Sequence, residues 1–97
     1  MMSFGLRISD AVYEILLTRE AQKDYQKLAK SVARRINQCL DNLRENPLQY
    51  PQAIPLKGKL AGSYRWRTGD WRVVYEVNTD EQIVIVLQIT HRSKVYK

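Results

Sequence analysis

Three segments with strand character follow one another near the end of the chain, and only short turns separate them. They span residues 62–67, 71–77 and 83–90, joined through Thr68–Asp70 and Asn78–Gln82. All three are rich in aromatic and β-branched residues, which favour strands. A short turn can join two strands only when they run antiparallel. We therefore predict two successive hairpins, which together form an antiparallel meander.

The first half of the chain carries one strand signal and two helix signals. Val12–Leu17 is a short apolar run typical of a strand. Thr18 and Ser31 each precede a segment whose apolar residues recur every three or four positions, so each offers its hydroxyl as an N-cap. We expect the second helix to stop near Asn46, because Pro47 disfavours helical geometry in the residue before it.

The order of these segments defines the expected fold. Residues 47–61 carry all three prolines and read as a connecting loop, with a short extended piece near Ile54–Leu56. The chain of 97 residues is long enough for one hydrophobic core. We predict an α+β fold with the order β-α-α-β-β-β over residues 11–97, a single compact domain in which a helical hairpin covers one face of an antiparallel sheet. Residues 1–10 form an N-terminal extension.

Composition excludes several classes of function. One cysteine allows neither an intramolecular disulfide nor a cysteine-based zinc site, and one histidine adds little, so we expect no metal. No glycine-rich phosphate loop is present, so we expect no nucleotide cofactor. The longest apolar run, Ile83–Leu87, is far too short to span a membrane, and no secretory signal is present. A small, basic, cytoplasmic protein with a formal net charge of +6 is the expectation.

Alternation along the strands sorts their side chains into two faces. In the first two strands of the meander, the bulkier sets point to the helices: Tyr64 and Trp66, then Trp71, Val73, Tyr75 and Val77. In the last strand, the same rule assigns Ile83, Ile85, Leu87 and Ile89 to the helix side.

The opposite face then collects basic side chains. Arg65, Arg67 and Arg72 share it, and Arg92 arrives from the end of the last strand. Four converging guanidiniums repel one another unless water or an anion screens them. Phosphate suits such a set, because arginine offers planar, bidentate donors. The competing interpretation of each single arginine is a solvated strand residue that pairs with Glu76 or Asp70.

Two residues near the C-terminus add to this picture. His91 is either a surface residue at a strand end or a proton donor and acceptor near neutral pH. Tyr96 is either an aromatic platform for a nucleobase or part of C-terminal packing.

Cys39 lies on an apolar helix stripe and is most simply a buried small hydrophobe.

Three stretches of the chain resemble the RelE-type toxins of the RelE/ParE toxin–antitoxin superfamily. YEILLTREAQKDYQKL (Tyr13–Leu28) resembles the opening strand and first helix of these toxins. PLKGKLAGSYRWRTGDWRVVYEV (Pro55–Val77) resembles their central hairpin, and HRSKVYK (His91–Lys97) resembles their final His-Arg-x-x-x-Tyr segment. The match covers about residues 12–97, in the order of the predicted elements.

The resemblance implies a ribosome-dependent, metal-independent mRNA endonuclease that needs no cofactor. Such toxins cut mRNA in the ribosomal A site, where the ribose 2′-OH attacks the adjacent phosphorus and a 5′-OH leaves. By position, the resemblance implies that Arg65 and Arg67 occupy the two basic strand sites and that Arg72 contacts the phosphate. It also implies that Arg92 is the C-terminal catalytic arginine and that Tyr96 orients or stacks on the substrate. We further expect contacts to RNA or the ribosome from four lysines, Lys57, Lys59, Lys94 and Lys97.

The strand positions differ from those relatives that carry lysines there, one of which is proposed as the base. Arginine is a poor general base, so His91 is the candidate for that role or for the acid. The expected partners are a cognate antitoxin, the ribosome with its mRNA, and operator DNA only through the antitoxin, with no membrane. Two alternatives remain: a gyrase-inhibiting toxin of the ParE branch that cuts no RNA, and a co-repressor that binds operator DNA within an antitoxin complex.

Overall fold

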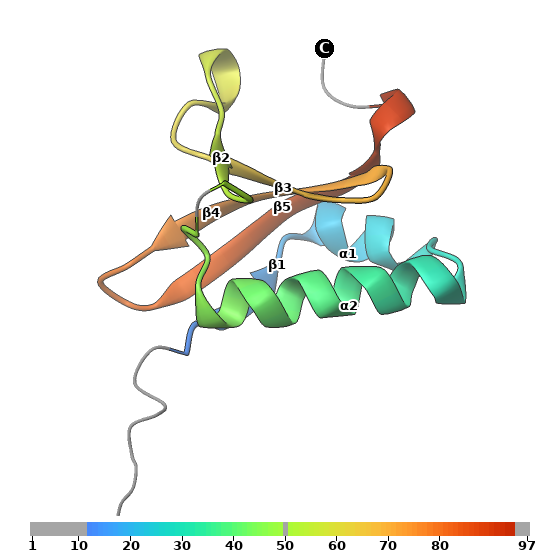
Figure 1. Cartoon of the computed structure of the whole chain (residues 1–97), viewed down its shortest axis with the longest axis horizontal. Coiled ribbons are helices and arrows are strands. Elements are labelled where there is room, and N and C mark those ends of the chain that lie inside the picture. The colour runs from blue at the N-terminus through green and yellow to red at the C-terminus, as the bar shows by residue number, and fades with distance from the viewer. Residues whose placement is uncertain (1–11, 50, 95–97) are drawn as a thin grey trace, which may run out of the picture.

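Two helices cover one face of a five-stranded sheet, and the other face is left open by the helices (Figure 1). This computed structural model describes residues 12–49 and 51–94. The elements in chain order are β1 (Glu14–Leu17), α1 (Arg19–Gln26), α2 (Lys30–Glu45), β2 (Ile54–Pro55), η3 (Gly58–Leu60), β3 (Tyr64–Thr68), β4 (Trp71–Asn78), β5 (Ile83–His91) and η4 (Arg92–Lys94), where η marks a 3₁₀ helix. The expected α+β class and the single helical layer are confirmed, whereas the predicted extension at residues 1–10 lies outside the described residues.

The sheet is mixed and not antiparallel throughout. Its strand order is β1-β5-β4-β3-β2, and β2 to β5 pair antiparallel as the meander requires. β1 pairs parallel with β5, with Glu14 opposite Ile83 and Leu17 opposite Val86. The expectation of a wholly antiparallel sheet is therefore wrong at this edge. The helical hairpin carries the chain from β1 to β2 at the opposite edge of the sheet. The antiparallel steps from β2 through β3 and β4 then bring β5 beside β1 in the same direction as β1.

Thr18 ties the first helix to the sheet. Its Oγ1 accepts a hydrogen bond from the Ala21 backbone N–H at 3.1 Å, which is the predicted N-cap. The same hydroxyl donates to the Leu87 carbonyl at 3.1 Å, so the helix start is fixed against β5. The predicted Ser31 cap is wrong, because α2 begins at Lys30 after Ala29 and has no side-chain cap bond. Ala29 already supplies the carbonyl that accepts the first helical bond, from Ala33.

The core lies between the helices and the sheet. Its buried members are Ala21, Ile36, Cys39, Leu43, Ala53, Trp66, Val73, Tyr75, Val84, Val86 and Ile89. Tyr75 is fully buried and its hydroxyl donates to the Pro47 carbonyl at 2.7 Å, so this polar atom is satisfied inside the core. Trp71 and Val77 pack against the core from its rim, which confirms that the bulkier face of β4 points to the helices.

A β-bulge in β5 overturns the predicted face of that strand. Val74 pairs with Gln88, but the next residue, Tyr75, pairs with Val86, so Leu87 is an extra residue on β5. A bulge of this kind reverses the alternation beyond it. Val84 and Val86 are therefore buried in the core, while Ile83, Ile85 and Leu87 are not, and only Ile89 of the predicted set is buried there.

Cys39 provides a test of this core. Burial raises the pKa of its thiol to about 12, so the thiolate is scarce in the folded protein at pH 8. We expect iodoacetamide to react with the folded chain at pH 8 on the order of a hundredfold or more slowly than with the unfolded chain, since only the thiolate is nucleophilic. Because Cys39 is the sole cysteine, mass spectrometry reports this reaction without ambiguity. Equal rates with and without denaturant would contradict the buried position.

Candidate nucleic-acid interface

The sheet face away from the helices carries three of the predicted arginines. Arg67 pairs directly with Arg72 across β3 and β4, and Arg72 pairs in turn with Thr90 of β5. Two residues further along the same two strands, Arg65 pairs with Val74. Residues directly opposite each other on paired strands point to the same face. We call this surface, with Arg65, Arg67 and Arg72, the arginine face.

The pairing of Arg67 with Arg72 opposes two positive charges. Directly opposite residues on antiparallel strands have Cβ atoms roughly 4.5–5.5 Å apart, and like charges at that separation destabilise a sheet. Arg72 is held in place by the backbone, because its Nη1 donates to the Gly69 and Trp71 carbonyls, each at 3.2 Å. An anion placed between the two guanidiniums would relieve their repulsion and accept bidentate hydrogen bonds.

Arg65 borders a hollow at the outer edge of the same face. The hollow has a volume of about 290 Å³ and is lined by Pro51, Gln52, Ile54, Arg65 and Arg67. The Arg65 Nε atom is buried and has no hydrogen-bond partner among the described residues. A buried donor without an acceptor is costly, so the Arg65 side chain is held in this position at some expense of stability.

The two-residue turn between β3 and β4 gathers further cationic side chains. The Arg92 backbone N–H donates to the Asp70 carbonyl at 2.7 Å, and the Arg92 Nε lies 3.7 Å from Asp70 Oδ1. Gly69 has a φ of +62°, and a Cβ at this position would lie 2.7 Å from Arg35 Nη1 of α2. The turn therefore favours glycine for its positive φ, and a larger residue would also displace the flexible tip of Arg35. Arg72 and Arg92 are anchored on this same turn.

Sequence reasoning did not find the contribution of Arg35. It belongs to a helix and is distant in sequence from every strand arginine, and no helical pattern indicates that it reaches the turn. Asp70 was expected only as a pairing partner for an arginine, and it pairs with Arg92.

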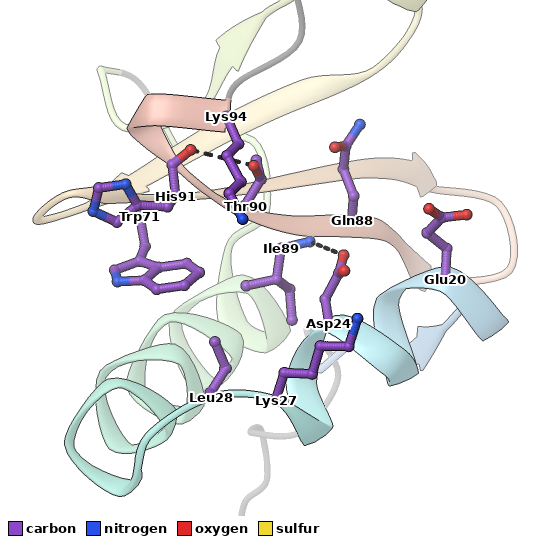
Figure 2. Close-up of a pocket in the computed structure, with 10 residues that line it drawn as sticks. All are labelled: Glu20, Asp24, Lys27, Leu28, Trp71, Gln88, Ile89, Thr90, His91 and Lys94. Carbon is purple, nitrogen blue, oxygen red and sulfur yellow. Dashed lines mark hydrogen bonds between the residues drawn. The ribbon is translucent and has the colours of Figure 1, made fainter.

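His91 lies on the other side of the sheet from the arginine face. It pairs directly with Trp71, and the two rings meet edge to face with centroids 5.3 Å apart and an interplanar angle of 84°. Figure 2 shows both residues in a groove of about 360 Å³ between α1 and the end of β5. In this groove, Asp24 Oδ2 accepts the Ile89 backbone N–H at 2.9 Å and so caps the edge of β5.

The predicted lysines are dispersed. Lys57 and Lys59 are exposed on the β2–β3 connection, which projects from the sheet on the side away from the helices (Figure 1). Lys94 lines the groove beside α1. Tyr96 and Lys97 lie outside the described residues. Within residues 12–49 and 51–94, no three His, Cys, Asp or Glu side chains gather in a group that could hold a metal ion. No helix in that part of the chain is long and apolar enough to cross a membrane.

Comparison with known protein families shows which family this chain belongs to. Residues 15–96 match the model of the ParE toxin of the type II toxin–antitoxin system parDE. The chain belongs to this toxin family. Its wider group is the RelE/ParE superfamily, as the resemblance in sequence implied.

Relatives of this ParE-family toxin agree in sequence and in structure. It is 30% identical over 90 residues to Toxin RelE of Mycobacterium tuberculosis, a match that covers 91% of this chain and 90% of the relative. The toxin–antitoxin complex RelBE2 from the same organism contains a chain with 25% identity and a TM-score of 0.78, covering 89% of this chain and 98% of that one. The archaeal RelE–RelB complex from Pyrococcus horikoshii contains one with 29% identity and a TM-score of 0.72, covering 87% and 99%.

Proposed function

We propose that this type II toxin is an endonuclease that cuts mRNA in the ribosomal A site. The observation that carries the proposal is the direct cross-strand pairing of Arg67 with Arg72 on an open sheet face. Two opposed guanidiniums on neighbouring strands repel each other, and they match the charge and geometry of a phosphate. The similarity to Toxin RelE supports the same choice within the superfamily.

The arginine face fits the charge changes of the proposed reaction. The ribose 2′-oxygen attacks the adjacent phosphorus, the bond from phosphorus to the 5′-oxygen breaks, and the proton lost by the 2′-OH is balanced by one gained at the 5′-oxygen. Negative charge grows on the non-bridging oxygens in the pentacoordinate transition state. Arg67 and Arg72 would stabilise that charge, and such stabilisation is often the largest single contribution to catalysis.

The remaining basic residues would position the RNA. Arg65 and Arg67 line the hollow, where a phosphate oxygen or a base edge would meet their guanidinium groups. Arg92, held at the Asp70 turn, would contact the phosphate from the side of β5. We assign Tyr96 to stacking on the substrate. Four lysines would make further contacts to RNA or the ribosome: Lys57, Lys59, Lys94 and Lys97.

We also propose that a cognate antitoxin binds this toxin and covers or distorts the arginine face. The solved relatives from M. tuberculosis and P. horikoshii are complexes of toxin with antitoxin. A net charge of +6 and a cluster of arginines favour an acidic segment that folds as it binds. Operator DNA would be reached only through that antitoxin.

Cleavage on purified ribosomes tests the proposed activity. Ribosomes programmed with a defined mRNA are mixed with the toxin, and primer extension maps any cut in the A-site codon. We expect cutting by the wild type and by Arg34→Ala, a control that removes an exposed arginine of α2. A parallel assay measures DNA supercoiling by gyrase. Inhibition of gyrase with intact mRNA would overturn the proposal and establish the alternative known from the ParE branch.

A further inference from the structure

The ring of His91 makes two contacts to the residue that follows Arg92. Its Nδ1 lies 3.2 Å from the backbone nitrogen of Ser93, which donates its N–H, and 2.9 Å from Ser93 Oγ. A backbone N–H can only donate, so Nδ1 is an acceptor and carries no proton in this arrangement. In the neutral ring, the proton is then on Nε2.

This contact has the geometry of a helix N-cap. The 3₁₀ helix η4 starts at Arg92, so His91 is the N-cap residue and Ser93 is the second residue of the helix. N-cap side chains accept a hydrogen bond from the second or third residue of a helix, most often through an oxygen of Ser, Thr, Asp or Asn. Here an imidazole nitrogen takes that place. The edge-to-face contact with Trp71 orients the ring for it.

The cap lies where the chain leaves the sheet and Arg92 is fixed. The Arg92 backbone N–H bonds to the Asp70 carbonyl, on the same turn whose Gly69 carbonyl holds Arg72 Nη1. Chain direction at Arg92 is therefore constrained from two sides: by the bond to Asp70 and by the cap on Ser93. Loss of the cap frees the second constraint and loosens Arg92 relative to the arginine face.

We propose that His91 is a positioning residue for Arg92, acting through the neutral Nδ1 cap and not as a general acid or base. This inference rests on the proposed endonuclease function. Register supports it, because His91 pairs with Trp71 whereas the neighbouring Thr90 pairs with Arg72. Successive strand residues point to opposite faces, so the imidazole lies on the helix side of the sheet. The residues that line the groove there include Asp24, Lys27 and Lys94, but none of the three arginines of the arginine face.

Nitrogen NMR tests the cap independently of any activity. The chain has one histidine, so an untagged, ¹⁵N-labelled protein gives a single imidazole spectrum. At pH 8 we expect a bare Nδ1, a protonated Nε2, and a Ser93 amide protected from hydrogen exchange. A proton on Nδ1, or a Ser93 amide that exchanges as fast as an unstructured one, would overturn the proposal.

Two isosteric variants test the positioning role. The Oδ1 of asparagine occupies the place of Nδ1, whereas the amide of glutamine reaches the place of Nε2 and not that of Nδ1. On programmed ribosomes, we expect His91→Asn to cut within about threefold of wild type and His91→Gln to lose roughly tenfold, the size typical of one lost cap. A general acid or base would instead cost about 10²–10⁴-fold in both variants, and that result would overturn the proposal.

Ser93→Ala is the matched control, because it removes the hydroxyl and keeps the backbone N–H. We expect wild-type cleavage from it, and a loss equal to that of His91→Gln would show that the hydroxyl contact, and not the cap, is the one that matters. The two proposals fail separately. A wild-type protein that leaves mRNA intact on ribosomes refutes the endonuclease function, while the imidazole spectrum still decides whether the cap exists.

Discussion

Arg72→Ala is expected to lower the rate of mRNA cleavage about a hundredfold or more, because one charge-assisted donor to the transition state is lost. The folded state should survive. Arg72 sits opposite Arg67, so its removal relieves repulsion between like charges. Two of its hydrogen bonds go to the Gly69 and Trp71 carbonyls, at the end of the β3–β4 hairpin. We expect the free energy of unfolding to change by less than about 1 kcal/mol.

Single-turnover cleavage and a thermal melt together measure this prediction. Arg72→Lys is an informative companion, since lysine keeps the charge but lacks the bidentate fork, and its rate should fall between those of wild type and alanine. Arg34→Ala again controls for the general loss of one positive charge. If Arg72→Ala is folded and cuts as fast as wild type, Arg72 has no place in the site.

Trp66→Ala should lower the free energy of unfolding by about 3–5 kcal/mol, the range found when a large core aromatic is truncated. Trp66 is 6% exposed and points into the core from β3. Because Trp66 is part of the core, its packing holds β3 against the helices. Trp66 also stands between Arg65 and Arg67 in that strand. Domains of this size have only about 5–15 kcal/mol of stability in total, so the loss is a large share.

A urea titration followed by far-ultraviolet circular dichroism measures the change, and alkylation of Cys39 gives a second readout of opening. Trp66→Phe is the matched control: it keeps an aromatic ring in the core and should cost distinctly less. A Trp66→Ala protein within about 1 kcal/mol of wild type would mean that the core does not depend on this side chain. That outcome would contradict the burial described for β3.

Local signals were sufficient for much of the fold. Thr18 caps α1 because its hydroxyl lies within reach of a backbone N–H in the first turn of the helix, which has no partner inside the helix. This contact depends only on residues close together in sequence. Pro47 likewise ends α2 through its effect on the residue before it. The two hairpins follow from short turns between strand-like segments. The arginine face follows from alternation along β3 and β4, where no bulge lies between Arg65 and Arg72.

The candidate site could be predicted only where it lies within regular strands. Arg65, Arg67 and Arg72 are placed by alternation alone. At the Gly69–Asp70 turn, the pairing of an arginine with Asp70 was expected, whereas the approach of Arg35 from α2 was not predictable. Such contacts depend on how the helices and the chain end pack, which no local pattern encodes.

What the sequence determined by itself was the kind and order of elements, because helix and strand periods, caps and turns are local properties of the chain. The tertiary structure alone decided which side chains of β5 before the bulge reach the core, and the direction of β1. Leu87 is the extra residue of β5 opposite β4, and its carbonyl accepts a hydrogen bond from the Thr18 hydroxyl. A bulge is a property of a pair of strands, so the residues of one strand cannot reveal it. It reverses which side chains of β5 before Leu87 reach the core. Ile89 keeps the side that alternation predicts, and His91, two residues further on, lies beside Trp71 and away from the arginine face.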